Sequence, residues 1–152
     1  MKKILLLFLV VFSVSFSAQN LTEFRQLMQK GEASETHAKL LYDKSKKEFE
    51  RTQKPIYEAL FAVGNFFMAK HVGNPMSKYS YFNRGKKHLE NAIKRDPDNV
   101  EMRFMRYISQ DKTPSILGYK DQMESDKKFV LKELKNIKDE DLQSFIKKYF
   151  KL

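Results

Sequence analysis

The sequence predicts an all-α protein, and three observations support that prediction. Glycine and proline are scarce, with five and four residues in the 152-residue chain. Apolar residues recur at steps of three and four, which is the period of one helix face, and no stretch alternates as a half-buried strand does. Ser or Asp precedes several of these segments, as is typical of helix caps. We therefore expect helices joined by short turns.

The first 18 residues resemble a secretory signal peptide. Lysines at the second and third positions are followed by an unbroken apolar run over residues 4–12. That run is shorter than the about 20 apolar residues that a membrane-spanning helix needs. Small residues favour cleavage after Ser17, and cleavage after Ala18 is the alternative. We expect an exported protein, periplasmic or secreted, in which residues 19–152 form one helical domain that is not transmembrane.

The first half of that domain divides into three predicted helices. The first covers Leu21–Lys30 and ends at Gly31. The second, over Glu35–Thr52 after a Ser34 cap, has an amphipathic pattern. Its predicted inner stripe consists of His37, Leu40, Leu41, Ser45 and Phe49.

The third predicted helix, Ile56–His71, is apolar nearly all round, which is typical of a helix buried in a core. Gly64 lies in its middle, where glycine costs about 1 kcal/mol relative to alanine. We therefore expect a neighbouring helix backbone to approach Gly64 closely.

The second half begins after the break at residues 72–75. Ser77 is the expected cap of a helix that ends at Arg95, and Asp98 with Glu101 resembles a capping box for Val100–Gln110. A short helical turn after Pro114, a helix over Tyr119–Asn136 and a last helix capped by Asp139 complete the chain. The predicted inner stripe of the helix ending at Arg95 consists of Phe82, Gly85, Leu89, Ala92 and Ile93, and that of the last helix of Leu142, Phe145, Ile146, Tyr149 and Phe150.

Four spaced residues carry a family resemblance. Gly85, Leu89, Ala92 and Pro97 are similar to the second helix and closing turn of a tetratricopeptide repeat. The resemblance covers about 17 residues and implies tetratricopeptide-like helix pairs in an irregular right-handed array, with a concave surface that binds peptides or protein segments. A plain helical bundle is the alternative architecture.

The composition of the chain excludes some kinds of site and favours one kind of partner. The chain has no cysteine, which excludes disulfides, lipid attachment at cysteine and thiolate ligands. Lys and Arg number 29 against 19 Asp and Glu; without the two lysines of the leader the count is 27 against 19, a formal charge of +8. This charge favours anionic partners such as acidic envelope polymers or lipid headgroups. Nucleic acid is not an expected partner outside the cytosol. A surface on which the charges are simply solvated would have the same composition.

No catalytic, cofactor-binding or metal-ligating set is predicted. The three histidines lack the paired spacing of a zinc site, and an enzyme site built from Glu58, His71 or His88 would need a deep pocket that the sequence does not indicate. One segment, residues 78–87, interleaves aromatic and basic residues, a combination that stacks on ring-shaped ligands and pairs with anions. The alternative is that the aromatic rings of this segment pack in the core. The candidate partner-binding residues are Tyr79, Tyr81, Arg84, Lys86, Lys87, Arg103 and Arg106.

The sequence thus leads to two hypotheses of different class. The first is a non-enzymatic, exported helical adaptor that binds another envelope or secreted protein through a groove between helices. The second is a basic binder of an anionic envelope polymer or lipid surface, which would use the segment of residues 78–87.

Overall fold

The computed structural model describes residues 21–152, so the predicted signal peptide lies outside the described residues. Within this range the chain is helical and contains no strand, which confirms the all-α prediction. Residues 21–31 are helical and precede the longer helices. The elements that follow are α2 (Glu35–Thr52), α3 (Pro55–His71), α4 (Pro75–Arg95), α5 (Val100–Lys112), the 3-10 turn η1 (Ser115–Leu117), α6 (Met123–Glu133), η2 (Leu134–Asn136) and α7 (Glu140–Phe150).

Helix α3 is the centre of the fold, because it packs against α2 on one side and α4 on the other. Its middle, from Tyr57 to Asn65, is buried without interruption, as the apolar sequence predicts. A Cβ built on Gly64 would lie 2.8 Å from the Cα of Tyr42, so α2 approaches α3 as closely as predicted. Gly85 has the same role on the other side, since its Cβ would lie 3.0 Å from the carbonyl oxygen of Ala62.

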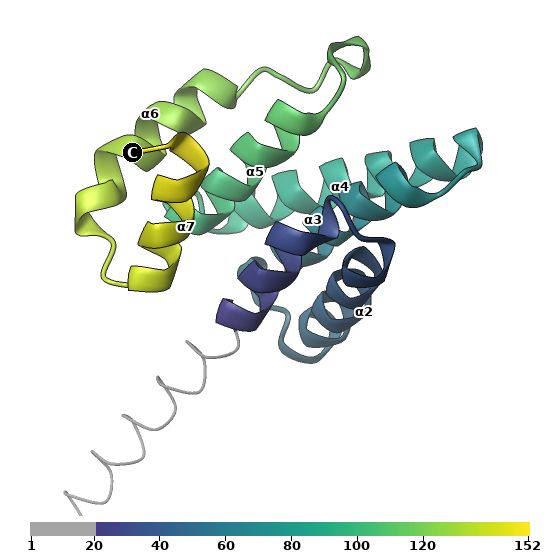
Figure 1. Cartoon of the computed structure of the whole chain (residues 1–152), viewed down its shortest axis with the longest axis horizontal. Helices are drawn as coiled ribbons and strands as arrows, with labels where there is room; N and C mark the ends of the chain where they lie inside the picture. The colour runs from purple at the N-terminus through teal and green to yellow at the C-terminus, as the bar shows by residue number, and fades with distance from the viewer. Residues whose placement is uncertain (1–20) are drawn as a thin grey trace, which may run out of the picture.

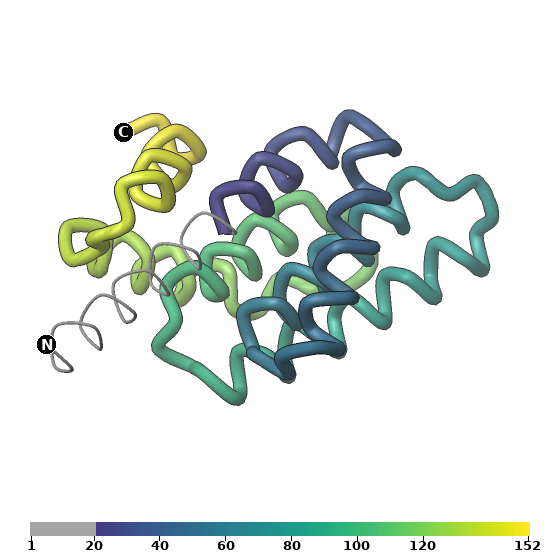
Figure 2. Tube along the Cα trace, turned by 90° about the horizontal axis from the view of Figure 1, so that it is seen from below, coloured from purple at the N-terminus to yellow at the C-terminus, as the bar shows by residue number. Residues whose placement is uncertain are grey.

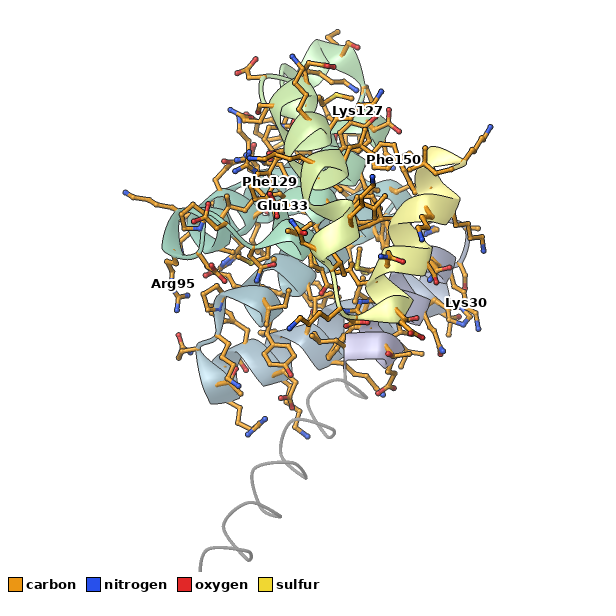
Figure 3. All side chains as sticks on the ribbon, turned by 90° about the vertical axis from the view of Figure 1, so that its left-hand side faces the viewer. Lys30, Arg95, Lys127, Phe129, Glu133 and Phe150 are labelled. Carbon is orange, nitrogen blue, oxygen red and sulfur yellow. The ribbon has the colours of Figure 1, made fainter. Side chains whose placement is uncertain are left out.

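The remaining helices form a second unit against this three-helix layer. Helix α5 packs mainly on α6, and α6 and α7 lie side by side (Figures 1 and 3). Helix 21–31 lies between α7 and the α2–α3 hairpin, as both the ribbon and the tube show (Figures 1 and 2). A plain helical bundle fits this arrangement, and the tetratricopeptide pattern stays a prediction. No helix in the described part of the chain combines the length and the hydropathy needed to cross a membrane.

Two predicted helix caps are wrong, because an asparagine caps the helix in both cases; α5 nevertheless starts at Val100 as predicted. Helix α4 begins at Pro75 and not after Ser77, since the Oδ1 of Asn74 accepts hydrogen bonds from the backbone N–H groups of Met76 (2.8 Å) and Ser77 (3.1 Å). Helix α5 is capped by Asn99, whose Oδ1 accepts from the N–H of Met102 at 3.1 Å. Asparagine is among the best N-cap residues because its side-chain oxygen accepts hydrogen bonds from the free N–H groups of the first turn. Proline is favoured at the first helical position, which is where Pro75 lies.

Three other expectations change in detail. Leu40 is 42% exposed, so it does not belong to the inner stripe of α2. The helix predicted from Tyr119 starts at Met123, because Gly118 adopts a left-handed φ of 62° and sends the chain inward. Tyr119 is buried outside any helix and donates a hydrogen bond to Glu90 Oε1 at 2.6 Å. The predicted stripe of α4 is confirmed residue by residue, as is the Asp139 cap of α7.

Candidate functional site

A pocket of about 800 Å³ opens where helix 21–31, the C-terminal ends of α3, α5 and α7, and the N-terminal end of α4 meet. We call it the groove. In Figure 1, α5 and the α3–α4 hairpin diverge from each other toward the turn at residues 72–74 and the loop at residues 113–120, which both border this region. The groove is lined mainly by apolar side chains, among them Phe66, Phe67, Phe82, Met105, Phe145 and Tyr149.

The apolar character of the groove follows from the sequence of α3. This helix is apolar on all sides, but its neighbours cover only its first two thirds: the run of buried residues ends at Asn65, and Phe66 and Phe67 stay partly exposed. Phe66 forms an aromatic cluster with Phe82 and Tyr119, at ring-centroid distances of 5.7 and 6.0 Å. Rings held in this way present a fixed apolar surface, which is the usual lining of a ligand or peptide site.

Lysines surround the groove. Lys70, Lys78, Lys112 and Lys148 line it from four different helices. Glu32 is the only acid among its lining residues in the described range, and it already pairs at 3.4 Å with both Lys70 and Lys112. The groove therefore carries a net positive charge at its edge.

Two of these lysines have no carboxylate partner within residues 21–152. The ammonium of Lys78 donates to the carbonyl oxygens of Ala69 (3.3 Å) and Lys70 (3.0 Å), at the C-terminal end of α3, so it is held in place by backbone groups. The ammonium of Lys148 has no side-chain partner in the described residues. Both ammonium groups remain able to bind an incoming anion.

Polar groups inside the groove are few. The hydroxyl of Thr113 donates to the carbonyl oxygen of Ser109 at 2.7 Å, which closes the C-terminal end of α5. The phenol of Tyr149 donates to Asp111 Oδ2 at 2.6 Å, and burial together with this hydrogen bond raises its pKa above the ordinary value, so it stays neutral. The groove consequently offers an apolar surface with charges at its edge and little hydrogen-bonding capacity within.

Of the predicted partner-binding residues, only Tyr79 lines the groove, where it is 61% exposed. Tyr81 packs edge-on against Tyr42, with centroids 5.9 Å apart, and Arg84 lies 5.4 Å above its ring. Lys86 lies 5.1 Å above the ring of Tyr119, and Lys87 is exposed. These residues lie along α4 rather than converging on one point.

Arg103 and Arg106 have structural partners. Both contact the fully buried carboxylate of Asp126, Arg106 at 2.6 and 2.9 Å, and Arg106 also contacts Glu90 at 2.8 Å. The side chain of Arg106 is 8% exposed, and Arg103 in addition stacks on Phe129, 4.6 Å from its centroid. We therefore leave both residues out of the proposed binding surface.

The histidines also have local partners. The Nδ1 of His88 lies 3.0 Å from Glu58 Oε1, and the same buried carboxylate accepts hydrogen bonds from Asn91 (2.8 Å) and Arg95 (2.9 Å). Arg95, at the edge of the molecule in Figure 3, also donates to the carbonyl of Gln53 at 2.5 Å. This set ties α4 to α3. It lies away from the groove, as none of its members is a lining residue.

His71 lies 2.9 Å from the carbonyl oxygen of Gly31, and His37 lies 2.8 Å from the Ser34 hydroxyl. No group of three His, Asp or Glu residues in the described range is arranged to hold a metal ion. No protein-family model matches the chain, and no curated protein or solved structure is significantly similar to it.

Proposed function

We propose that this chain is an exported, non-enzymatic helical adaptor that docks an apolar segment of another envelope or secreted protein in the groove. The observation that carries the proposal is the groove itself, a mainly apolar pocket with a volume of about 800 Å³ that is lined by five helices. Concave apolar surfaces of this size are where proteins take up ligands or partner side chains. Binding is favoured over chemistry because His37, His71 and His88 all lie outside the groove and two of its hydroxyls, those of Thr113 and Tyr149, are engaged with the fold.

The proposal is tested by photo-crosslinking. Benzoyl-phenylalanine replaces Tyr79 at the groove edge or, as a matched control, the exposed Lys47 on α2, and the purified protein is irradiated in an envelope extract. We expect one protein to be crosslinked from position 79 only. Adding Ala69→Trp, which places an indole on the groove wall, should abolish that product.

Equal crosslinking from positions 79 and 47, or a product that is indifferent to Ala69→Trp, would contradict docking in the groove. Circular dichroism and the melting temperature of Ala69→Trp must match those of the unmodified protein, so that loss of crosslinking reports on the groove and not on folding.

A second candidate function, binding of an anionic envelope polymer or lipid surface, is favoured by the charge of α4. This helix has six Lys and Arg residues and one acid, Glu90. Within residues 21–152 only Arg95 among these cations has a carboxylate partner. The five others give α4 an excess of positive charge, and Tyr79 and Tyr81 lie on the same helix.

Chromatography distinguishes the two candidates. Replacement of Arg84, Lys86 and Lys87 by alanine should reduce retention on heparin or on anionic vesicles without unfolding the domain, because these side chains are exposed. The matched control replaces Lys47, Lys128 and Lys132, which are also exposed. Equal loss in both variants would reduce this candidate to an effect of net charge, and salt-insensitive capture of a protein partner would favour the adaptor.

A further inference from the structure

We propose that the segment docked in the groove is an amphipathic α-helix of the partner, whose apolar face enters the groove and whose flanking positions carry Glu or Asp. This inference rests on the proposed function and names the chemistry of the partner. Three properties of the groove lead to it: its shortage of hydrogen-bonding groups, its exposed apolar edge and its two lysines that lack a carboxylate partner.

The shortage of hydrogen-bonding groups disfavours an extended peptide. A peptide in extended conformation brings unpaired backbone N–H and C=O groups, which are costly to bury without partners. Inside the groove, the Thr113 hydroxyl is engaged with the carbonyl of Ser109, and the Tyr149 phenol is engaged with Asp111. Its other neutral polar side chains are three: Gln29, Tyr79 and Ser109. A helix satisfies its own backbone groups and needs only apolar contact from its partner.

The apolar surface extends past the groove, which favours a helix over a small apolar ligand. Two of the six large hydrophobic side chains that are exposed in the described range line the groove, Tyr79 (61%) and Leu117 (39%), and two more are next to lining residues in the sequence, Met76 (78%) beside Pro75 and Ile116 (93%) beside Leu117. A single acyl chain would leave such residues in water, whereas a helix about 10 Å wide covers both the groove and its edge.

The charge at the edge selects acidic flanks. Glu32 is already shared by two lysines, so it does not neutralise Lys78 or Lys148. These two ammonium groups come from α4 and α7, on different helices that both line the groove. A partner helix with carboxylates beside its apolar face would pair with them, while a helix with basic flanks would be repelled.

The test uses a display library of short amphipathic helices in which the apolar positions and the flanking positions are randomised separately. The library is selected on the intact domain and counter-selected on Ala69→Trp. We expect helical sequences with large apolar residues at i, i+3 or i+4 and i+7 and with Glu or Asp at the flanks. For a selected peptide, Lys78→Glu with Lys148→Glu should raise the Kd about tenfold or more, and exchanging the peptide's acids for lysines should restore binding to that variant.

The matched control for the charge reversal is Lys47→Glu with Lys128→Glu, which changes the net charge equally on surfaces outside the groove. Groove-dependent peptides that lack a helical pattern or acidic flanks would overturn this inference and leave the docking proposal standing. A library that yields no binder sensitive to Ala69→Trp would overturn both. Selected peptides that bind equally to the two charge-reversed variants would remove the role of Lys78 and Lys148.

Discussion

The two units of this molecule are held together in different ways. Helices α2, α3 and α4 pack mainly through apolar side chains, and Gly64 and Gly85 let their backbones approach closely, with the buried Glu58 carboxylate as one polar link between α3 and α4. In the second unit, an aromatic cluster joins α5 to α7, and in it Phe104 contacts Phe145, Tyr149 and Phe150 at 5.2 to 5.9 Å. Buried ion pairs join α5 to helix 21–31, α4 and α6. The first unit therefore depends mainly on an apolar pattern, and the second depends to a larger extent on where charged side chains meet.

Arg25 is the clearest case of such a charge. Its side chain is 1% exposed and binds Glu101 at 2.7 and 2.8 Å, Asp139 at 2.9 Å and Asp141 at 2.7 Å. Burial acts to lower the pKa of Arg25, but the hydrogen bonds and charges of these acids outweigh it and raise that pKa. One guanidinium thus joins helix 21–31 to α5 and α7.

Removing this guanidinium should weaken the link between helix 21–31 and the C-terminal helices, and it gives the largest effect we expect. Arg25→Ala leaves Glu101 buried without a partner, and loss of one member of a buried ion pair costs about 3–5 kcal/mol. The free energy of unfolding in urea measures the loss. The control is Lys39→Ala, which removes an exposed pair with Asp43 and should leave stability unchanged within error. If both variants were equally stable, the ion pairs would not be what fastens the C-terminal helices.

The second prediction tests the close packing of the first unit. Gly64→Ala places a methyl group 2.8 Å from the backbone of Tyr42, and overpacking of this kind costs about 1–3 kcal/mol, of which alanine's better helix propensity returns about 1 kcal/mol. We expect a net loss of stability in thermal or urea unfolding. Gly73→Ala is the control, because a Cβ there has no neighbour within 4 Å. A Gly64→Ala protein more stable than the parent would show that α2 can move away from α3 at little cost.

The same contrast explains which parts of the fold could be predicted from the sequence. The buried stripe of α4, the bounds of α2 and the close approach at Gly64 follow from local spacing, and the structure confirms them. The role of Arg25 could not be found in this way. Its partners Glu101 and Asp141 lie 76 and 116 positions further along the chain, and a lone cation on a helix has the same local sequence whether it is solvated or buried.

The candidate site was predictable only in part. Tyr79 was found because aromatic and basic residues alternate around it, but the same signal also marked Tyr81 and Arg84, which pack beside Tyr42. The all-round apolar sequence of α3 predicts that Phe66 and Phe67 are buried. The sequence does not show that the C-terminal end of α3 is the end left uncovered, because that depends on how α5 diverges from α3 and α4. Lys148 becomes a groove residue through tertiary packing alone.

The third prediction concerns the start of α5, where the two units join. Asn99→Ala removes the side-chain cap of the Met102 N–H and should cost about 1 kcal/mol of stability. Asp98→Ala is the neighbouring control and should change little, because Asp98 makes no cap in the described structure. Equal losses in urea unfolding would mean that the acid before the asparagine also contributes to the cap.

The smallest effect is expected from Asp139, which caps α7 and contacts Arg25. Burial acts to raise the pKa of Asp139, but hydrogen bonds from the N–H of Leu142 and from Arg25 outweigh it, so the pKa lies below its ordinary value of 3.8. A carboxylate with a lowered pKa in the folded state stabilises the fold above the ordinary pKa and loses that contribution as the pH falls through the lowered value. Stability should therefore decline below about pH 4.

Asp139→Asn separates the charge of this residue from its cap, because asparagine caps a helix as well as aspartate does but does not titrate in this range. We expect the variant to be slightly less stable at neutral pH and to lose less stability between neutral pH and pH 3, as measured by urea unfolding at each pH. Glu140→Gln, an exposed neighbour in the same first turn, serves as the control. If the Asp139→Asn and parent profiles stayed parallel, the charge of Asp139 would not contribute to the acid sensitivity of the fold.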